Sequence, residues 1–178
     1  MNEQKNGTGL QDFIKKFNSR DAHPIFQFIK YGLSGGAATT VHMTLFFLLT
    51  LTLFPALTGE DPFVKVFGLF GVDFAVHDIS DAVRSTRSMY ANAVAFVFSN
   101  MVAYLINVLW VFKRGRHHWA VELLLFYAVS SISFFPGTAL QGGLVRWTGM
   151  ETSYAFVACL VTSTLINYVC RKFLIFKG

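Results

Sequence analysis

Five cationic side chains lie where apolar segments are predicted to begin or end, and together they are suited to hold an anionic group. They are Lys30, Lys113, Arg171, Lys172 and Arg146. The first four are expected at one depth near the inner headgroups, and Arg146 at the outer end. Arginine grips a phosphate through two parallel hydrogen bonds, and lysine supplies a compact charge. Basic residues also flank most cytoplasmic helix ends and extend toward the headgroups. A phosphate-binding rim and ordinary flanking charge are therefore both open interpretations.

A second set of polar side chains lies within the apolar segments. His42 is expected near mid-membrane, where an ionisable group is costly and becomes a functional hypothesis. It is suited to bond a ligand hydroxyl, to carry a proton, or to donate to a neighbouring helix. Asn107 and Asn167 lie near the inner boundary, and their amides either join helices or line a polar cavity above the basic rim, as do Asn92 and Asn100. Glu122, at the inner entrance of another segment, is placed to pair with a cation.

Composition indicates that a bilayer surrounds these residues. The chain of 178 residues is 53% hydrophobic and 14% charged, with 20 Phe, more apolar surface than a soluble domain of this size can bury. The two cysteines, Cys159 and Cys170, are about 16 Å apart on one predicted helix, too far to bridge. There is no zinc-type spacing, nucleophile–base grouping or phosphate-cradling glycine loop. We therefore expect no enzyme activity, cofactor, metal or nucleic-acid partner.

Four apolar segments are long enough to cross a hydrocarbon core of about 30 Å as helices. They cover residues 28–54, 90–112, 121–145 and 154–176. Most Lys and Arg flank the same ends of these segments, which by the positive-inside rule places both termini and the middle loop in the cytoplasm. The predicted fold class is an all-α, multi-pass membrane protein with four transmembrane helices.

An internal repeat divides the chain into two halves. Residues 90–113 and 154–177 align without a gap and agree at seven positions, among them Tyr90/Tyr154 and Phe112/Phe176. Each half is then an in–out–in helical hairpin, and the halves are parallel repeats. We expect a cytoplasmic segment at residues 1–27 and a transmembrane domain at residues 28–178. Repeat 1 covers residues 28–113 with an outer-loop insert at 55–89, and repeat 2 covers residues 121–177.

The N-terminal segment and the outer-loop insert each have two interpretations. Leu10, Phe13, Ile14 and Phe17 recur at helical spacing beside lysines, which predicts a short amphipathic helix on the inner leaflet. A disordered basic tail is an equally good interpretation. The insert is either a substrate-specific lid or a tolerated loop extension.

Small residues and one proline predict how the helices pack. Gly32 and Gly36 form one small-residue pair, and Ala91, Ala95 and Ser99 belong to a stripe on the next segment. Such residues let helix backbones approach closely in lipid. Pro136, in mid-segment, predicts a kink in its helix, either a hinge or a static bend.

The segment ends carry a family signature. Residues 104–112 (YLINVLWVF) and 167–176 (NYVCRKFLIF) resemble the Asn-Phe-x-x-Asn-Arg-x-Trp-x-Phe endings of the GtrA-like family, and residues 28–36 (FIKYGLSGG) resemble its opening motif. Length, four spans and duplication also fit, so the resemblance covers residues 28–177. Only the second copy keeps a cation after its Asn. The resemblance therefore favours Arg171 and Lys172 as the phosphate contacts.

The resemblance implies a small protein of the bacterial inner membrane that serves cell-surface polysaccharide synthesis. Members are proposed to flip a polyprenyl-phosphate-linked sugar beside a membrane glycosyltransferase. A scaffold that docks this glycosyltransferase, without transport of its own, fits the basic rim equally well. A small multidrug-type antiporter ranks last, because no carboxylate lies at mid-depth. Four short helices enclose little space, so a homodimer is plausible.

Overall fold

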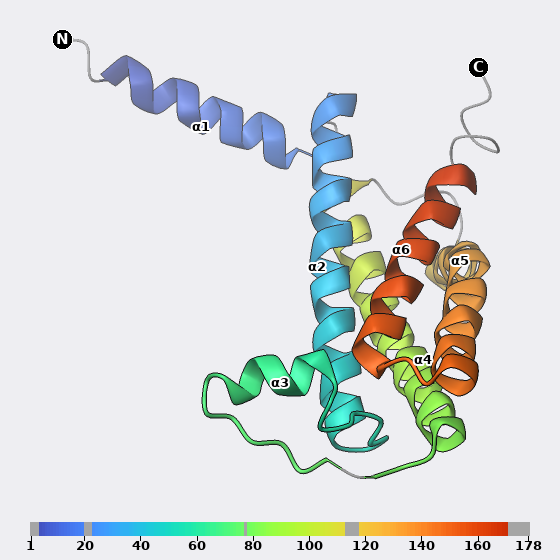
Figure 1. Ribbon diagram of the computed structural model, residues 1–178. Coiled ribbons are helices and arrows are strands. Elements are labelled where there is room, and N and C mark those ends of the chain that lie inside the picture. The colour runs from blue at the N-terminus through green and yellow to red at the C-terminus, as the bar shows by residue number, and fades with distance from the viewer. Residues whose placement is uncertain (1–3, 20–22, 77, 113–117, 171–178) are drawn as a thin grey trace.

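The structure is a computed structural model that describes residues 4–19, 23–76, 78–112 and 118–170 (Figure 1). Within these ranges the chain forms helices and no strand. The helices are α1 (Gln4–Asn18), α2 (Pro24–Leu51), α3 (Pro62–Gly68), α4 (Asp81–Ile106), α5 (Trp119–Thr148) and α6 (Thr152–Cys170), with a π-helical segment, η1 (Asn107–Val111), directly after α4. The prediction of an all-α fold is confirmed.

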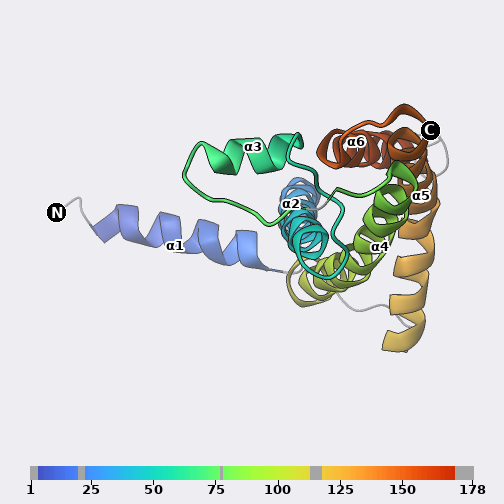
Figure 2. The same ribbon diagram turned by 60° about the horizontal axis from the view of Figure 1, so that its bottom comes forward.

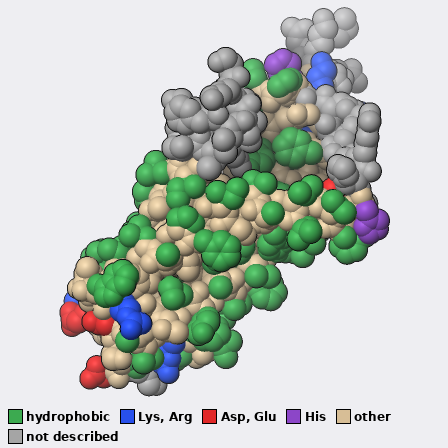
Figure 3. Space-filling view, turned by 90° about the vertical axis from the view of Figure 1, so that its right-hand side faces the viewer, with side chains coloured by type: hydrophobic (Ala, Val, Ile, Leu, Met, Phe, Trp, Pro, Cys, Tyr) green, Lys and Arg blue, Asp and Glu red, His purple; other side chains and the backbone are tan. Residues whose placement is uncertain are grey.

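Three helical stretches in the described residues are long and apolar enough to cross a membrane. They are Pro24–Leu51, Asp81–Val111 and Trp119–Thr148, and the first, with 28 residues, extends about 42 Å. The apolar part of α6, Thr152–Asn167, is shorter. One face of the molecule carries apolar side chains along its length, with charged side chains gathered at its lower end (Figure 3). The chain is thus a multi-pass membrane protein, and a fourth crossing by α6 remains a prediction.

The helix boundaries follow from local chemistry. Pro24 and Pro62 occupy the first turns of α2 and α3, where no amide donor is needed. Asp61 caps α3 by accepting from the Phe63 amide at 2.9 Å. Gly149 ends α5 with a φ of +67°, a left-handed conformation that favours glycine. Because α4 begins at Asp81, residues 81–89 of the expected insert belong to a transmembrane helix.

The long helices pack in a fixed order. α2 lies along α4, α4 along α5, and α5 along α6. In the described residues α2 and α6 hardly approach one another at the level of the backbone. Side chains bridge them instead, and the Phe46 ring of α2 stacks on the Phe156 ring of α6 with 3.8 Å between centroids. The bundle therefore has three packed helix pairs and one seam, between α2 and α6.

Close packing involves different glycines from those predicted. Ala91, Ala95 and Ser99 of α4 are buried, as their small size predicts. Gly32 and Gly36 are exposed, and a Cβ at either would have no neighbour within 4 Å among the described residues. The prediction that this pair packs against another helix of the same chain is therefore wrong for the described residues. The α2 face that packs carries Lys30 and Ser34 instead. The tight approach occurs on α5. A Cβ at Gly137 would meet Cys159 O at 3.1 Å and Ser163 Oγ at 2.3 Å.

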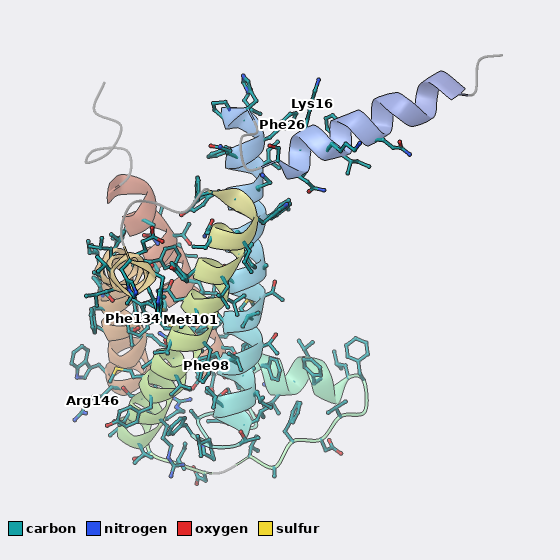
Figure 4. All side chains as sticks on the ribbon, turned by 180° about the vertical axis from the view of Figure 1, so that it is seen from behind. Lys16, Phe26, Phe98, Met101, Phe134 and Arg146 are labelled. Atoms are coloured by element: carbon teal, nitrogen blue, oxygen red, sulfur yellow. The ribbon has the colours of Figure 1, made fainter. Side chains whose placement is uncertain are left out.

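α1 and α3 extend from opposite ends of α2. Both project to the same side of the bundle in two views (Figures 1 and 2). α1 is helical, as one interpretation of its spacing predicts. The ring centroids of Phe13 and Phe17 lie 5.6 and 5.7 Å from that of Phe26 in α2. Lys16 and Phe26 lie together at this end of the bundle, and Arg146 lies at the other (Figure 4).

Candidate functional site

A polar cavity of about 210 Å³ lies between the four long helices. Its lining includes Thr39 and His42 of α2; Asn92, Ser99 and Asn100 of α4; Ser130 and Ser133 of α5; and Cys159, Ser163, Thr164 and Asn167 of α6. Every polar group in this lining is a hydroxyl, an amide, a thiol or the His42 imidazole, and no described Lys, Arg, Asp or Glu contributes. Ala38, Phe96, Ala103, Phe134 and Leu160 complete the lining, so the cavity offers both hydrogen-bonding groups and apolar surface.

His42 is held in the cavity by α4. Its Nε2 lies 2.7 Å from Asn92 Oδ1, and its Nδ1 lies 3.0 Å from Ser99 Oγ. Because an amide oxygen only accepts, Nε2 carries the proton and donates it to Asn92. Ser99 Oγ lies within hydrogen-bond distance of both His42 Nδ1 and Phe96 O, so its single proton is shared between these two acceptors or donated to one of them. This arrangement settles the ring's orientation without a charged partner.

Asn92 extends the same network to the other two helices. Its Nδ2 donates to Thr138 Oγ1 of α5 at 2.7 Å and to Cys159 Sγ of α6 at 3.6 Å. All four long helices are thus joined at one level through a single buried amide. The sequence predicted that amides would meet other helices, and the structure identifies Asn92 as the residue at the centre.

One amide in the cavity wall lacks a partner. Asn100 is 8% exposed, and its Nδ2 has no hydrogen-bond partner among the described residues. A buried donor without a partner costs roughly 1–3 kcal/mol. Since Asn100 also lines the cavity, a ligand hydroxyl that accepted from it would recover part of that cost.

Lys30 does not lie on an open rim, although its position at the start of an apolar segment predicts one. The side chain is fully buried, and its ammonium donates to Ser19 O at 2.9 Å and to Trp110 O at 3.0 Å. The ammonium also lies 5.6 Å from the centroid of the Trp110 ring, within the range of a cation–π contact. Trp110 in turn donates from Nε1 to Asn18 Oδ1. Lys30 therefore ties α1 and η1 to α2.

The other predicted site residues are spread over the bundle. Asn167 lines the cavity. Asn107, at the start of η1, donates from Nδ2 to Ala103 O at 2.9 Å, and its buried Oδ1 has no partner in the described residues. Glu122 is half-buried near the start of α5, and its Oε1 has no described partner either. Arg146 is exposed at the outer end of α5. The structure does not describe Lys113, Arg171 and Lys172.

The end of the bundle where α4 begins, which the sequence predicts to be the outer end, holds a buried ion cluster that the sequence does not predict. Arg84 is 2% exposed and donates to Glu151 Oε2 at 2.9 Å, to Asp81 Oδ1 at 2.7 Å and to Gly149 O at 2.9 Å. Thr58 Oγ1 also donates to Glu151 Oε2. This cluster fastens the start of α4 and the loop after α2 to the turn between α5 and α6.

A second buried carboxylate, Asp61, also joins the loop after α2 to the start of α6. Asp61 has no exposed surface and accepts from the Ser153 amide at 3.0 Å and from the Ser153 hydroxyl. Thr152 Oγ1 donates to Ala56 O close by. Polar residues that recur in both outer loops were the available sequence signal. The loop after α2 is therefore bonded to the turn before α6 rather than free on the membrane surface.

Comparison with known proteins places this arrangement in a family. The family model described as GtrA/DPMS, transmembrane domain, matches residues 63–176. The chain belongs to this family. The match takes in α3 to α6, so the resemblance noted for residues 28–36 lies outside it. No solved structure matches the chain. For a GtrA/DPMS domain, membership implies a role in polysaccharide or glycan modification, with polyprenyl-linked sugars and glycosyltransferases as its context.

Proposed function

We propose that this GtrA/DPMS-family protein moves a polyprenyl-phosphate-linked sugar from the inner to the outer leaflet and is not itself an enzyme. The observation that carries the proposal is the uncharged cavity, lined by hydroxyl and amide groups, between helices of membrane-spanning length. A sugar crossing a bilayer loses the hydrogen bonds that water gave its hydroxyls, and this loss raises the barrier to crossing. Asn100 and Asn167 offer replacement bonds along the way, and His42 does so by exchanging its bond to Asn92 or to Ser99.

The cavity suits a small headgroup. Its volume of about 210 Å³ is below the roughly 300 Å³ at which sites for drug-sized ligands begin. One sugar ring is therefore a better match than an oligosaccharide. The prenyl tail stays in the lipid throughout, and net flow follows consumption of the sugar outside, so no cofactor is needed.

The phosphate is assigned to the inner rim. Lys113, Arg171 and Lys172 supply the cations there, with Arg146 at the outer end as the contact on release. Lys30 belongs to the same end as Lys16 and Phe26, but its ammonium reaches a phosphate only by leaving Ser19 O or Trp110 O. Glu122 and Asn107, each with an oxygen free in the described residues, complete the polar surface near this rim. We propose the bacterial inner membrane as the protein's location, with both termini cytoplasmic.

The test is transfer of a fluorescent polyprenyl-phosphoryl hexose between the leaflets of liposomes that hold the purified full-length chain. We expect faster transfer than in empty liposomes, and a large loss in the Arg171→Gln/Lys172→Gln double variant. Lys65→Gln, which changes an exposed lysine on α3, is the matched control. If the folded double variant transferred the lipid at the wild-type rate, the phosphate assignment would be contradicted.

A second candidate is a scaffold for a membrane glycosyltransferase. The specific observation in its favour is the exposed face of α2, where Gly32, Gly35 and Gly36 have open space around them and leave room for another transmembrane helix. The partner is then the glycosyltransferase or a second copy of the chain. Co-purification with the transferase, together with no transfer by the isolated protein, would favour this function.

A further inference from the structure

We propose that the seam between α2 and α6 is the portal through which the polyisoprenyl tail of a lipid-linked ligand leaves the polar cavity. This inference rests on the proposed function, because it assigns the tail of the same ligand. A lipid-linked headgroup enters a bundle only if one wall opens sideways to the bilayer. The burial of the cavity lining identifies which wall that is.

The cavity has a buried back and an exposed mouth. On the back wall, Asn92 and Asn100 of α4 and Ser133 of α5 are buried. At the mouth, Thr39 of α2 and Thr164 of α6 also line the cavity, yet both are exposed. The exposed lining residues thus belong to the two helices that are not packed on each other. The cavity opens between α2 and α6.

The chemistry of the mouth suits a hydrocarbon chain. Thr39 Oγ1 donates to Gly35 O at 2.9 Å, and Thr164 Oγ1 donates to Leu160 O at 2.8 Å, each within its own helix. Because these hydroxyls are already satisfied, the mouth presents methyl groups at no hydrogen-bonding cost. The free donor, Asn100 Nδ2, lies at the back. Polar and apolar groups line both sides of the cavity, with Phe96 and Phe134 at the back and Ser163 and Asn167 on α6. The exposed mouth at Thr39 and Thr164 nevertheless has both of its hydroxyl protons donated within its own helices, so a hydrocarbon tail leaves no donor unpaired there.

The seam is closed in its outer half. The Phe46 and Phe156 rings stack across it, and the Phe47 ring contacts both Phe156, at 5.7 Å, and Phe63 of α3, at 4.0 Å. His42 lies at the inner edge of this aromatic group, 5.8 Å from Phe156. Further toward the inner end, positions 32, 35 and 36 of α2 have no described neighbours within 4 Å of a Cβ. In this conformation the portal faces the inner leaflet, so the tail enters from that side.

The test is photolabelling of the full-length chain in liposomes by a polyprenyl-phosphoryl hexose that carries a diazirine on its tail, with mapping of the labelled peptides. We expect label on α2 and α6 beside the mouth, around Thr39 and Thr164. Thr164→Trp fills the mouth and should lower the label yield about tenfold, which corresponds to a loss of about 1.4 kcal/mol in binding free energy. Leu165→Trp is the matched control, because Leu165 is 57% exposed and does not line the cavity.

The outcomes separate this inference from the proposed function. Label on the seam that disappears in Thr164→Trp supports the portal even if the protein transfers no lipid between leaflets. Efficient transfer with label spread over the α4 and α5 faces would overturn the portal and leave the proposed function intact. Equal labelling of the seam by a diazirine phosphatidylcholine, not competed by the prenyl-linked hexose, would assign the seam to bulk lipid and also overturn the portal.

Discussion

At the scale of single residues, two neighbouring asparagines on α4 have different tasks. Asn92 makes its bonds within the protein, to His42, Thr138 and Cys159. Asn100 lines the cavity, and its buried amide nitrogen has no partner among the described residues. Their positions in the sequence do not distinguish them, since both are amides in one apolar segment. Their hydrogen bonds do, because Asn92 is bonded to three other helices and the Asn100 amide nitrogen has no partner among the described residues.

We predict opposite phenotypes for the two alanine variants. Asn92→Ala should lower the free energy of unfolding by about 1 to 3 kcal/mol, because His42 Nε2 and Thr138 each lose a buried partner. Asn100→Ala should leave the free energy of unfolding nearly unchanged and weaken binding of a polyprenyl-phosphoryl hexose. Thermal unfolding in detergent measures the first quantity, and equilibrium binding in the same detergent measures the second. Equal loss of stability in both variants would show that the distinction is wrong.

At the scale of helices, the contact between α5 and α6 depends on glycine at one position. Gly137 allows the α5 backbone to come close to α6, where Cys159 O would lie 3.1 Å from an added Cβ. A backbone oxygen cannot move aside as a side-chain tip can. Gly142 is less constrained, since a Cβ there would mainly meet the flexible Met89 side chain. The glycines that the sequence pattern favoured, Gly32 and Gly36, lie in open space.

We predict that Gly137→Ala separates α5 from α6 and lowers the free energy of unfolding by about 1 to 3 kcal/mol, the usual cost of overpacking. Gly36→Ala is the control. It adds a methyl group where nothing lies within 4 Å, and alanine is the better helix former by up to about 1 kcal/mol. Thermal unfolding of both variants tests the pair. A stable Gly137→Ala together with a destabilised Gly36→Ala would reverse the assignment of the packed face.

At the scale of the whole molecule, polar contacts close the outer end and aromatic contacts close the outer half of the seam. Arg84 and Asp61 bond the loop after α2 and the start of α4 to the turn between α5 and α6. Any movement that opens the cavity outward has to break the Phe46–Phe156 stack and strain these bonds. The outer cluster is thus both a stabilising feature and part of the barrier to opening.

We predict that Arg84→Met lowers the thermal unfolding midpoint markedly, because it leaves the Asp81 and Glu151 carboxylates without their cation. Removing one partner of a buried ion pair costs about 3 to 5 kcal/mol, and the cost here is smaller because Glu151 keeps 23% of its side-chain surface. The control is Lys65→Gln. Lys65 pairs with Glu60 on the surface, where its hydrogen bond and charge hold the pKa of the Glu60 carboxyl below the usual value. Exposed pairs contribute little to stability. A similar shift of the unfolding midpoint in both variants would show that the Arg84 cluster does not stabilise the fold more than a surface pair does.

Hydropathy and local spacing by themselves determined much of this protein. They predicted an all-helical membrane chain and offered an N-terminal helix with Phe13 and Phe17 on one face as one of two interpretations. The motifs at the segment ends added the resemblance to the GtrA-like family, which the family match confirms. Hydropathy also singled out His42 and the asparagines as groups that need partners. These features are local, because the cost of a polar group in lipid depends on its own segment.

The tertiary structure alone decided which groups meet. His42 meets Asn92, Arg84 meets Glu151, and Lys30 is buried against Trp110 instead of lying on an open rim. Each pair joins residues at least 50 positions apart in the chain. Such meetings depend on the rotation and spacing of packed helices, which small clashes and fits over a whole interface determine. For the same reason, only the structure shows that the backbones of α2 and α6 stay apart in the described residues, where side chains alone bridge them beside the cavity.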